Sequence, residues 1–154
     1  MNTIPIRCTM VSVVVLDRLD ENARILLLRR AEAHLQGVWS YVAGHVEKGE
    51  TGWQAACREL AEETGLTPQA LYASNFCEQF YAAVHDCIMV VPAFVARVDG
   101  SARIRLNAEH SAYRWLPLDQ AMQTVPFGGQ HDLFAHVQRE FIEREPSKHL
   151  RIAI

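Results

Sequence analysis

The sequence predicts one domain of the α+β class, and three observations favour it. The chain has 154 residues, of which 49% are hydrophobic, so one domain with a sizeable core is expected. Apolar runs of strand length lie on both sides of a segment with strong helical propensity. No internal repeat, low-complexity stretch or linker divides the chain, so we expect residues 1–154 to form a single domain.

Six segments are expected to form β-strands, because apolar, β-branched or aromatic residues dominate them. The first is rich in valine and the second has the sequence RILLLRR, with a polar turn at residues 17–22 between them. The third is short, and the fourth and fifth are joined near residues 83–85. The predicted strands are Thr9–Leu16, Arg24–Arg30, Val38–Val42, Leu71–Tyr81, Asp86–Val98 and Tyr113–Leu116.

A helix is predicted directly after residues 44–50, which are expected to form a loop. Thr51 and Gln54 match the capping-box pattern of a helix start. The residues from 55 to 63 contain no proline, glycine or β-branched residue, so their propensity favours a helix. Gly65 suits the left-handed position just past a helix end, and Pro68 prevents a longer continuation.

The last third of the chain predicts two more helices. Pro117–Thr124 begins like a helix, with proline at an early position. His131–Arg144 places four apolar side chains on one stripe, as in an amphipathic helix. Residues 126–131 (PFGGQH) are expected to form a loop, either a mobile segment that closes over a substrate or a simple connector. Residues 148–154 form either a loose tail or an extra edge strand.

The first predicted helix carries three glutamates close together. Glu59, Glu62 and Glu63 are related by i, i+3 and i+4, which places them on one face of the helix. Because like charges repel, either their pKa values rise or a cation neutralises them. Oxygen ligands without a nearby Cys or His pair favour Mg²⁺ first and Mn²⁺ second. The alternative is a solvated acidic face that binds no metal.

The stretch from Gly44 to Leu66, GHVEKGETGWQAACRELAEETGL, resembles the Nudix box, G-x5-E-x7-R-E-U-x-E-E-x-G-U, in which U is a bulky aliphatic residue. The matching positions are Gly44, Glu50, Arg58, Glu59, Leu60, Glu62, Glu63, Gly65 and Leu66. This resemblance to Nudix hydrolases implies an α/β/α sandwich around a mixed β-sheet. It also implies Mg²⁺-dependent hydrolysis of a nucleoside diphosphate linked to another moiety.

The resemblance implies metal ligands in this chain. Glu59, Glu62 and Glu63 are expected to bind the metal, together with the backbone carbonyl of Gly44. Glu109 lies in a loop before the last predicted strand and is expected to complete the metal site or to act as the base. The alternatives are a plain turn glycine at position 44 and a surface acid at position 109. His110 is expected to be a loop residue, since hard Mg²⁺ prefers oxygen.

The resemblance also implies catalytic roles. One carboxylate activates the attacking water, and Glu59 or Glu62 is the favoured base. Arg58 is expected to pair with a box glutamate and orient it, and Glu50 belongs to the same catalytic set.

Substrate contacts are expected outside the box. Arg29 and Arg30 end the second predicted strand, where successive side chains face opposite sides, so one is expected to bind phosphate and the other to be solvated. Aromatic side chains are candidates for stacking on a base, although each is a candidate for the core as well. These aromatic residues are Trp39, Phe80, Tyr81 and Phe127.

Composition limits the partners of the chain. The net charge of -3 gives no general attraction to nucleic-acid polymers or anionic membranes, so we expect a small phosphoanhydride substrate. The four cysteines show no C-x-x-C spacing and no secretory signal is recognised, which favours a cytoplasmic protein with reduced thiols and no zinc site.

The expected activity is Mg²⁺-dependent cleavage of a nucleoside or pterin triphosphate to pyrophosphate and a monophosphate. The segments VAGHVEKGE and EHSAYRWL together resemble the branch that includes dihydroneopterin triphosphate pyrophosphatase. Val42 and Ala43 stand where many Nudix proteins have Pro-Gly, which is expected to alter the stiffness of the loop. Two alternatives stay open: a hydrolase of dinucleoside polyphosphates or nucleotide sugars, and a non-catalytic module that senses a nucleotide.

Overall fold

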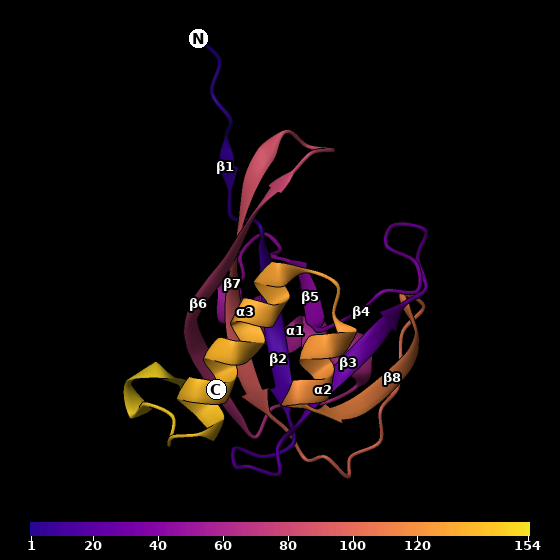
Figure 1. Ribbon diagram of the computed structural model, residues 1–154, viewed down its shortest axis with the longest axis vertical. Helices are drawn as coiled ribbons and strands as arrows, with labels where there is room; N and C mark the ends of the chain where they lie inside the picture. Colours follow the sequence, from indigo (N-terminus) through magenta and orange to yellow (C-terminus); the bar gives the residue numbers. More distant parts are fainter.

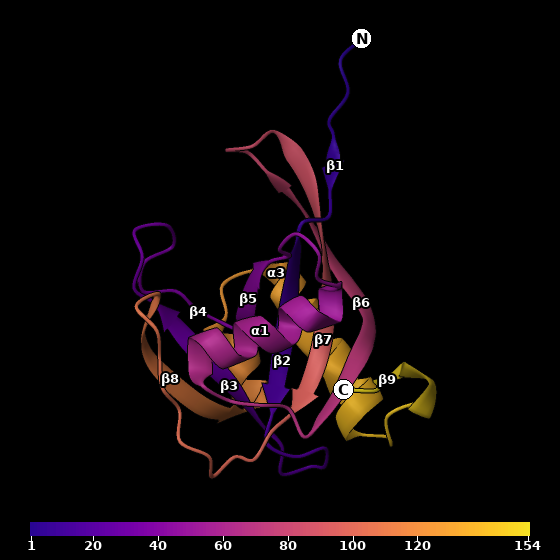
Figure 2. The same ribbon diagram turned by 180° about the vertical axis from the view of Figure 1, so that it is seen from behind.

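A mixed nine-stranded sheet lies between two helical layers in the computed structural model, which describes residues 1–154. Helices α2 (Leu118–Thr124) and α3 (Gly128–Val137) cover one face, as Figure 1 shows, and α1 (Gly52–Thr64) covers the other, as Figure 2 shows. Two buried apolar clusters fill the spaces between these layers, one on each face. This architecture is the predicted α/β/α sandwich, and the α+β class is confirmed.

The strands are joined in the order β4-β3-β2-β7-β6-β9. β5 also pairs with β2, β8 with β3 and β1 with β7. The sheet is mixed because β7 runs parallel to β2 and to β1, whereas the other pairs are antiparallel. The strands are β1 Ile6–Arg7, β2 Met10–Leu16, β3 Arg24–Arg30, β4 Trp39–Ser40, β5 Val42–His45, β6 Ala70–Ala82, β7 Cys87–Arg97, β8 His110–Pro117 and β9 Arg151–Ile152.

Helix α1 has the predicted bounds because its capping signals are local. The Thr51 side chain accepts a hydrogen bond from the Gln54 N–H at 3.3 Å, and the Gln54 side chain accepts one from the Thr51 N–H at 2.8 Å. Gly65 ends the helix with φ 75°, and its N–H donates to the Ala61 carbonyl. Apolar residues of α1 are buried against the sheet, which fixes the direction of the remaining helix faces.

Two predictions in the middle of the chain are wrong. Residues 38–42 do not form one strand: β4 pairs with β3, β5 pairs with β2, and Tyr41 lies between them. The chain changes pairing partner there, and a local apolar pattern carries no sign of such a change. The last predicted strand, placed at residues 113–116, is longer, because all of β8 pairs along β3.

The C-terminal third differs from the prediction as well. Residues 126–131 are not a loop, since α3 begins at Gly128 with Phe127 as an N-cap that makes no side-chain hydrogen bond. The helix predicted to Arg144 ends at Val137 and continues as a π-helical turn, η1 (Gln138–Ile142). A 3₁₀ turn, η2 (Lys148–Leu150), then leads to β9, which pairs with β6. The tail is therefore the edge strand, one of the two alternatives. None of the helices has the length and apolar character needed to cross a membrane.

Candidate metal and catalytic site

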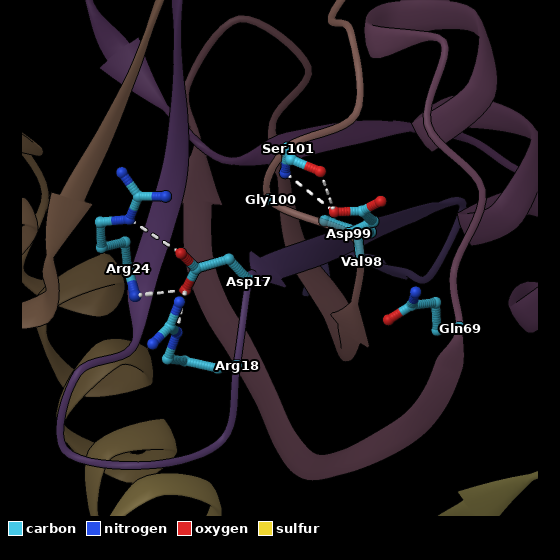
Figure 3. A pocket seen from close by; sticks show the side chains of 8 residues that line it. All are labelled: Asp17, Arg18, Arg24, Gln69, Val98, Asp99, Gly100 and Ser101. Carbon is cyan, nitrogen blue, oxygen red and sulfur yellow. Dashed lines mark hydrogen bonds and ion pairs between the residues drawn. The ribbon is translucent and has the colours of Figure 1, made fainter.

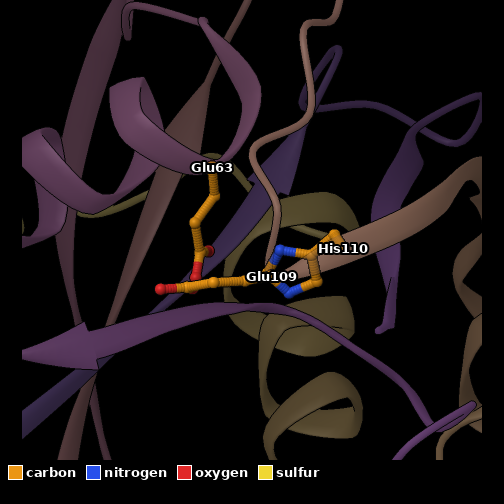
Figure 4. A group of neighbouring side chains, drawn as sticks. All are labelled: Glu63, Glu109 and His110. Carbon is orange, nitrogen blue, oxygen red and sulfur yellow. The ribbon is translucent and has the colours of Figure 1, made fainter. Parts of the chain in front are cut away.

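Three side chains that are distant in sequence meet beside the last turn of α1. Glu63 comes from α1, Glu109 directly precedes β8 and His110 is its first residue. One ligand atom from each lies within 4.8 Å of the other two, and Figure 4 shows the Glu63 side chain directed toward Glu109. The Ala31 N–H donates to the Glu109 carbonyl at 2.8 Å, which ties this loop to the end of β3. His110 is buried in a strand, so its predicted loop position is wrong.

Glu63 is 2% exposed, and its Oε2 atom has no hydrogen-bond partner. Burial, together with the neighbouring charges of Glu59 and Glu109, raises the pKa of Glu63 to about 9. A buried carboxylate with an unpartnered oxygen beside two other acids is stabilised when a cation lies between them. The donor set is mainly carboxylate oxygen, which fits a hard divalent ion.

Gly44 provides the space for a second buried carboxylate. It lies in β5, paired with Val11 of β2, and a Cβ atom built on it would overlap the Glu59 carboxyl group. Glu59 is 9% exposed, and burial raises the pKa of its carboxyl while the Arg58 guanidinium opposes this. The glycine is therefore required by a close approach within a strand and does not form the turn of the alternative interpretation.

Arg58 holds three box carboxylates in place. Its guanidinium contacts Glu50 at 2.6 Å, Glu59 at 2.8 Å and Glu62 at 3.2 Å. Its Nη2 also donates to the His45 carbonyl at 2.8 Å. Hydrogen bonds from Arg58 lower the pKa of Glu50, and the same pairing raises the pKa of Arg58.

The three helix acids are not equivalent. Glu59 and Glu63 are buried, whereas the Glu62 side chain is 54% exposed and bound to Arg58. The expected single acidic face therefore has a buried part, next to Glu109, and a part open to solvent.

The two arginines at the end of β3 have different surroundings. Arg30 forms an ion pair with Glu32 at 3.3 Å and donates to the His34 carbonyl. Burial lowers the pKa of His110; Arg30 acts in the same direction and the Glu109 charge opposes it, which places Arg30 beside the acidic cluster. Arg29 is exposed and has no ion pair.

The predicted aromatic residues do not gather at the carboxylates. The Trp39 ring is half-buried and covered by the Arg114 guanidinium at 4.6 Å. Phe80 and Tyr81 lie near the tip of the β6–β7 hairpin, which projects from the body of the molecule beside the N-terminal segment (Figure 1). The Tyr81 hydroxyl donates to Asp86 at 2.7 Å. Phe127 is 49% exposed at the start of α3.

Sequence reasoning missed a buried polar group on the α3 face of the sheet. The Tyr41 hydroxyl donates to Glu78 Oε1, and the Gln130 amide donates to Ser40 Oγ at 2.8 Å. The one sequence signal for this group was Glu78, a charged residue within an otherwise largely apolar predicted strand. Its partners come from other elements, so their proximity has no local pattern.

A separate hollow of about 360 Å³ lies at the carboxyl end of β2, whereas Gly44 pairs near the amino end of that strand. Figure 3 shows its polar lining, in which the Asp17 carboxylate accepts hydrogen bonds from the Arg24 N–H and Nε. Val98 is the one hydrophobic residue in this lining. Because Asp17 is already partnered and apolar surface is scarce, the hollow adds nothing to the acidic site.

Comparison with known proteins identifies the family. Residues 9–144 match the model of the NUDIX domain. The chain belongs to the NUDIX domain family. This NUDIX domain is 34% identical over 115 residues to the asymmetrical bis(5'-nucleosyl)-tetraphosphatase of Sus scrofa, covering 73% of this chain and 78% of that protein. The predicted family and the predicted class of enzyme, a Nudix-type hydrolase, are confirmed.

Two further similarities show the extent of the domain. The NUDIX domain is 35% identical over 120 residues to a Myxococcus xanthus protein named octanoyltransferase, covering 77% of this chain but only 33% of that relative's length. It also resembles the structure of the E. coli dihydroneopterin triphosphate pyrophosphohydrolase, with a TM-score of 0.69 at 23% identity over 90% of this chain and 98% of that one. At this identity the likeness shows the fold, and the branch stays a prediction.

Proposed function

We propose that this NUDIX domain is a Mg²⁺-dependent pyrophosphohydrolase that cleaves a nucleoside or pterin triphosphate to pyrophosphate and a monophosphate, with Mn²⁺ as a substitute ion. One observation carries the proposal: the buried Glu63 carboxylate has an unpartnered oxygen and lies beside two further acids, Glu59 and Glu109. Such a site favours a divalent cation, and the anhydride of a small phosphorylated substrate supplies the matching negative charge.

The residues that would hold the ion are Glu59, Glu63 and Glu109, with Glu62 and the Gly44 carbonyl at its edge. When bound, the ion polarises phosphoryl oxygens and offsets their charge. The close approach of Glu59 to Gly44 keeps that carboxylate fixed against the sheet, so it does not need to reorganise when the substrate arrives.

Water activation is assigned to Glu59 or Glu62. Burial raises the pKa of Glu59 against the opposing effect of Arg58, which makes its carboxylate a stronger base. Glu62 is open to solvent water and is held by Arg58. Arg58 also binds Glu50 and Glu59, so it orients either candidate base.

Phosphate binding is assigned first to Arg29, because its guanidinium is exposed and has no carboxylate partner. Arg30 lies beside His110 and is paired with Glu32, so it would have to exchange that carboxylate for a phosphate. With a net charge of -3, attraction of the anionic substrate depends on these local groups and on the cation. This assignment of phosphate binding is consistent with a cytoplasmic enzyme that acts on a soluble nucleotide or pterin.

A second candidate function is hydrolysis of a dinucleoside polyphosphate. The similarity to the Sus scrofa tetraphosphatase, which extends over 73% of this chain, favours it. Tyr81, one of the aromatic candidates for stacking on a base, does not add support, because its hydroxyl is bound to Asp86 on the projecting hairpin and away from the acids. A nucleotide-sensing module without catalysis is the least favoured reading, since every specified position of the box is present.

Product analysis tests the proposal. The purified protein with Mg²⁺ is incubated in ¹⁸O-water with nucleoside triphosphates, dihydroneopterin triphosphate, dinucleoside polyphosphates, nucleotide sugars and ADP-ribose, and the products are identified by mass. The proposal expects pyrophosphate and a monophosphate from a triphosphate. Two nucleotides from a dinucleoside substrate, with triphosphates left intact, would support the second candidate. Absence of turnover on the whole panel would contradict both.

A further inference from the structure

The polar group on the α3 face has no role in the acidic site. Glu78 of β6 is 5% exposed and Gln130 of α3 is 4% exposed. Glu78 lies opposite Val91 of β7, and Tyr41 packs edge-on against Phe134 of α3, so the group is enclosed between the sheet and the helix.

Acceptors outnumber donors in this group. The Tyr41 hydroxyl donates its proton to Glu78 Oε1, and Gln130 Nε2 donates to Ser40 Oγ. Burial and the Glu78 carboxylate raise the pKa of Tyr41, and a hydrogen bond with the Gln130 amide opposes this, which places that amide near the phenol oxygen. Gln130 Oε1 is buried without a partner, and no hydrogen bond reaches Glu78 Oε2. Because buried acceptors are normally satisfied, the orphaned Gln130 Oε1, beside a Glu78 oxygen that no protein donor reaches, indicates that a molecule outside the chain supplies the donors.

The start of α3 lies directly against these acceptors. A Cβ atom at Gly129 would lie 3.2 Å from Glu78 Oε2, and one at Gly128 would meet nothing within 4 Å. Gly129 therefore packs closely against the Glu78 carboxyl group with backbone atoms alone, and Phe127 beside it exposes an aromatic face. The N–H groups of Gly128 and Gly129 have no carbonyl partner, whereas those of Gln130 and His131 donate to the Phe127 carbonyl, so the two glycine N–H groups can donate to a ligand.

We propose that Glu78 and Gln130 select the base of the substrate, and that the base carries a ring N–H next to an amino group, the edge shared by guanine and 2-amino-4-oxopteridines. Glu78 Oε2 and Gln130 Oε1 accept from these two donors, and the neighbouring ring carbonyl accepts from the first N–H groups of α3. Adenine, cytosine and uracil each present only one donor group along this edge and leave one protein acceptor unpaired. Phe127 stacks on the ring. This inference rests on the proposed function and assigns its substrate class.

Equilibrium binding to the full-length protein with Mg²⁺ tests this assignment without requiring turnover. Calorimetric titration compares GMP with IMP, which lacks only the amino group, and with AMP. Wild-type protein is expected to bind GMP at least about 10-fold more tightly than either. Glu78→Gln places an amide N–H where an acceptor is needed, so GMP affinity is expected to fall about 10- to 100-fold while AMP affinity is unchanged.

Gln79→Ala is the matched control, since Gln79 is the exposed neighbour on the opposite side of β6 and its replacement leaves the GMP preference intact. Neopterin monophosphate is the second probe: tighter binding than GMP identifies a pterin substrate, and weaker binding a guanine nucleotide. Equal affinity of wild type for GMP and IMP, or no measurable binding of either, overturns the assignment. An equal loss of GMP and AMP binding in Glu78→Gln also overturns it, because a structural role predicts that result.

The two proposals fail separately. Selective GMP binding without hydrolysis of any triphosphate would contradict the enzymatic function and support the base assignment. Equal kcat/KM for GTP, ITP and ATP would support the enzymatic function and contradict the base assignment.

Discussion

Replacing Glu63 with glutamine is expected to stabilise the metal-free protein at neutral pH. The pKa of Glu63 is raised to about 9 from an unfolded value of 4.5, first by burial and then by the charges of Glu59 and Glu109. Above pH 4.5 the folded protein therefore holds a proton that the unfolded chain has released. Stability falls as the pH rises from about 4.5 to about 9, because the unfolded state binds fewer protons over this range. Glutamine is neutral throughout and removes this contribution.

The magnitude follows from the shift. The interval between the unfolded pKa of 4.5 and pH 7 is about 2.5 units, and each unit is worth about 1.4 kcal/mol. The Glu63 carboxyl therefore lowers the free energy of unfolding by about 3 kcal/mol at pH 7 in the absence of metal. A bound divalent ion reverses the balance in wild type by stabilising the ionised carboxylate, and Glu63→Gln loses that response.

The assay is urea unfolding followed by circular dichroism at several pH values between 5 and 9, first in EDTA and then in Mg²⁺. Wild type is expected to lose stability with rising pH in EDTA and Glu63→Gln to show a flatter profile. Glu62→Gln serves as the control, because the Glu62 side chain is 54% exposed. Parallel profiles for wild type and Glu63→Gln would refute the reasoning that a buried, uncompensated carboxylate lies at this position.

Three further predictions concern the same site. Glu59→Gln and Glu62→Gln are each expected to lower kcat by ~10²–10⁴ with an unchanged circular dichroism spectrum, and near-wild-type kcat in both would discard the assignment of the base. Gly44→Ala is expected to displace the Glu59 carboxyl group and weaken Mg²⁺ binding by at least about tenfold in a calorimetric titration; unchanged affinity would show that the overlap is relieved without moving the carboxyl. Arg58→Lys is expected to lower kcat more than it changes KM, since one ammonium cannot replace the planar guanidinium that contacts three carboxylates, and steady-state kinetics equal to wild type would argue against an orienting role.

Local signals explain what the sequence could predict. Thr51, Gln54 and Gly65 fix the two ends of α1 through contacts within a few residues, so the placement of the helix acids followed directly. Long-range packing explains the rest. Tyr41 separates two strands because β4 and β5 pair with different partners, and Glu62 turns to solvent because Arg58 binds it there.

The approach of Glu109 to Glu63 depends on the pairing of β8 with β3, which no local spacing encodes. The resemblance to a family supplied that expectation before the geometry did. It supplied no expectation for Glu78 and Gln130, which lie in different elements and meet only when α3 packs on the sheet.

The most direct test of the account is Mn²⁺ binding followed by electron paramagnetic resonance in the presence of a non-hydrolysable triphosphate. Wild-type protein is expected to remove the signal of free Mn²⁺ as it is titrated, while Glu63→Gln and Glu109→Gln leave much of that signal in place. A free Mn²⁺ signal that wild type does not reduce, or binding by both variants as tight as that of wild type, would contradict the claim that these carboxylates hold a divalent cation against a phosphoanhydride.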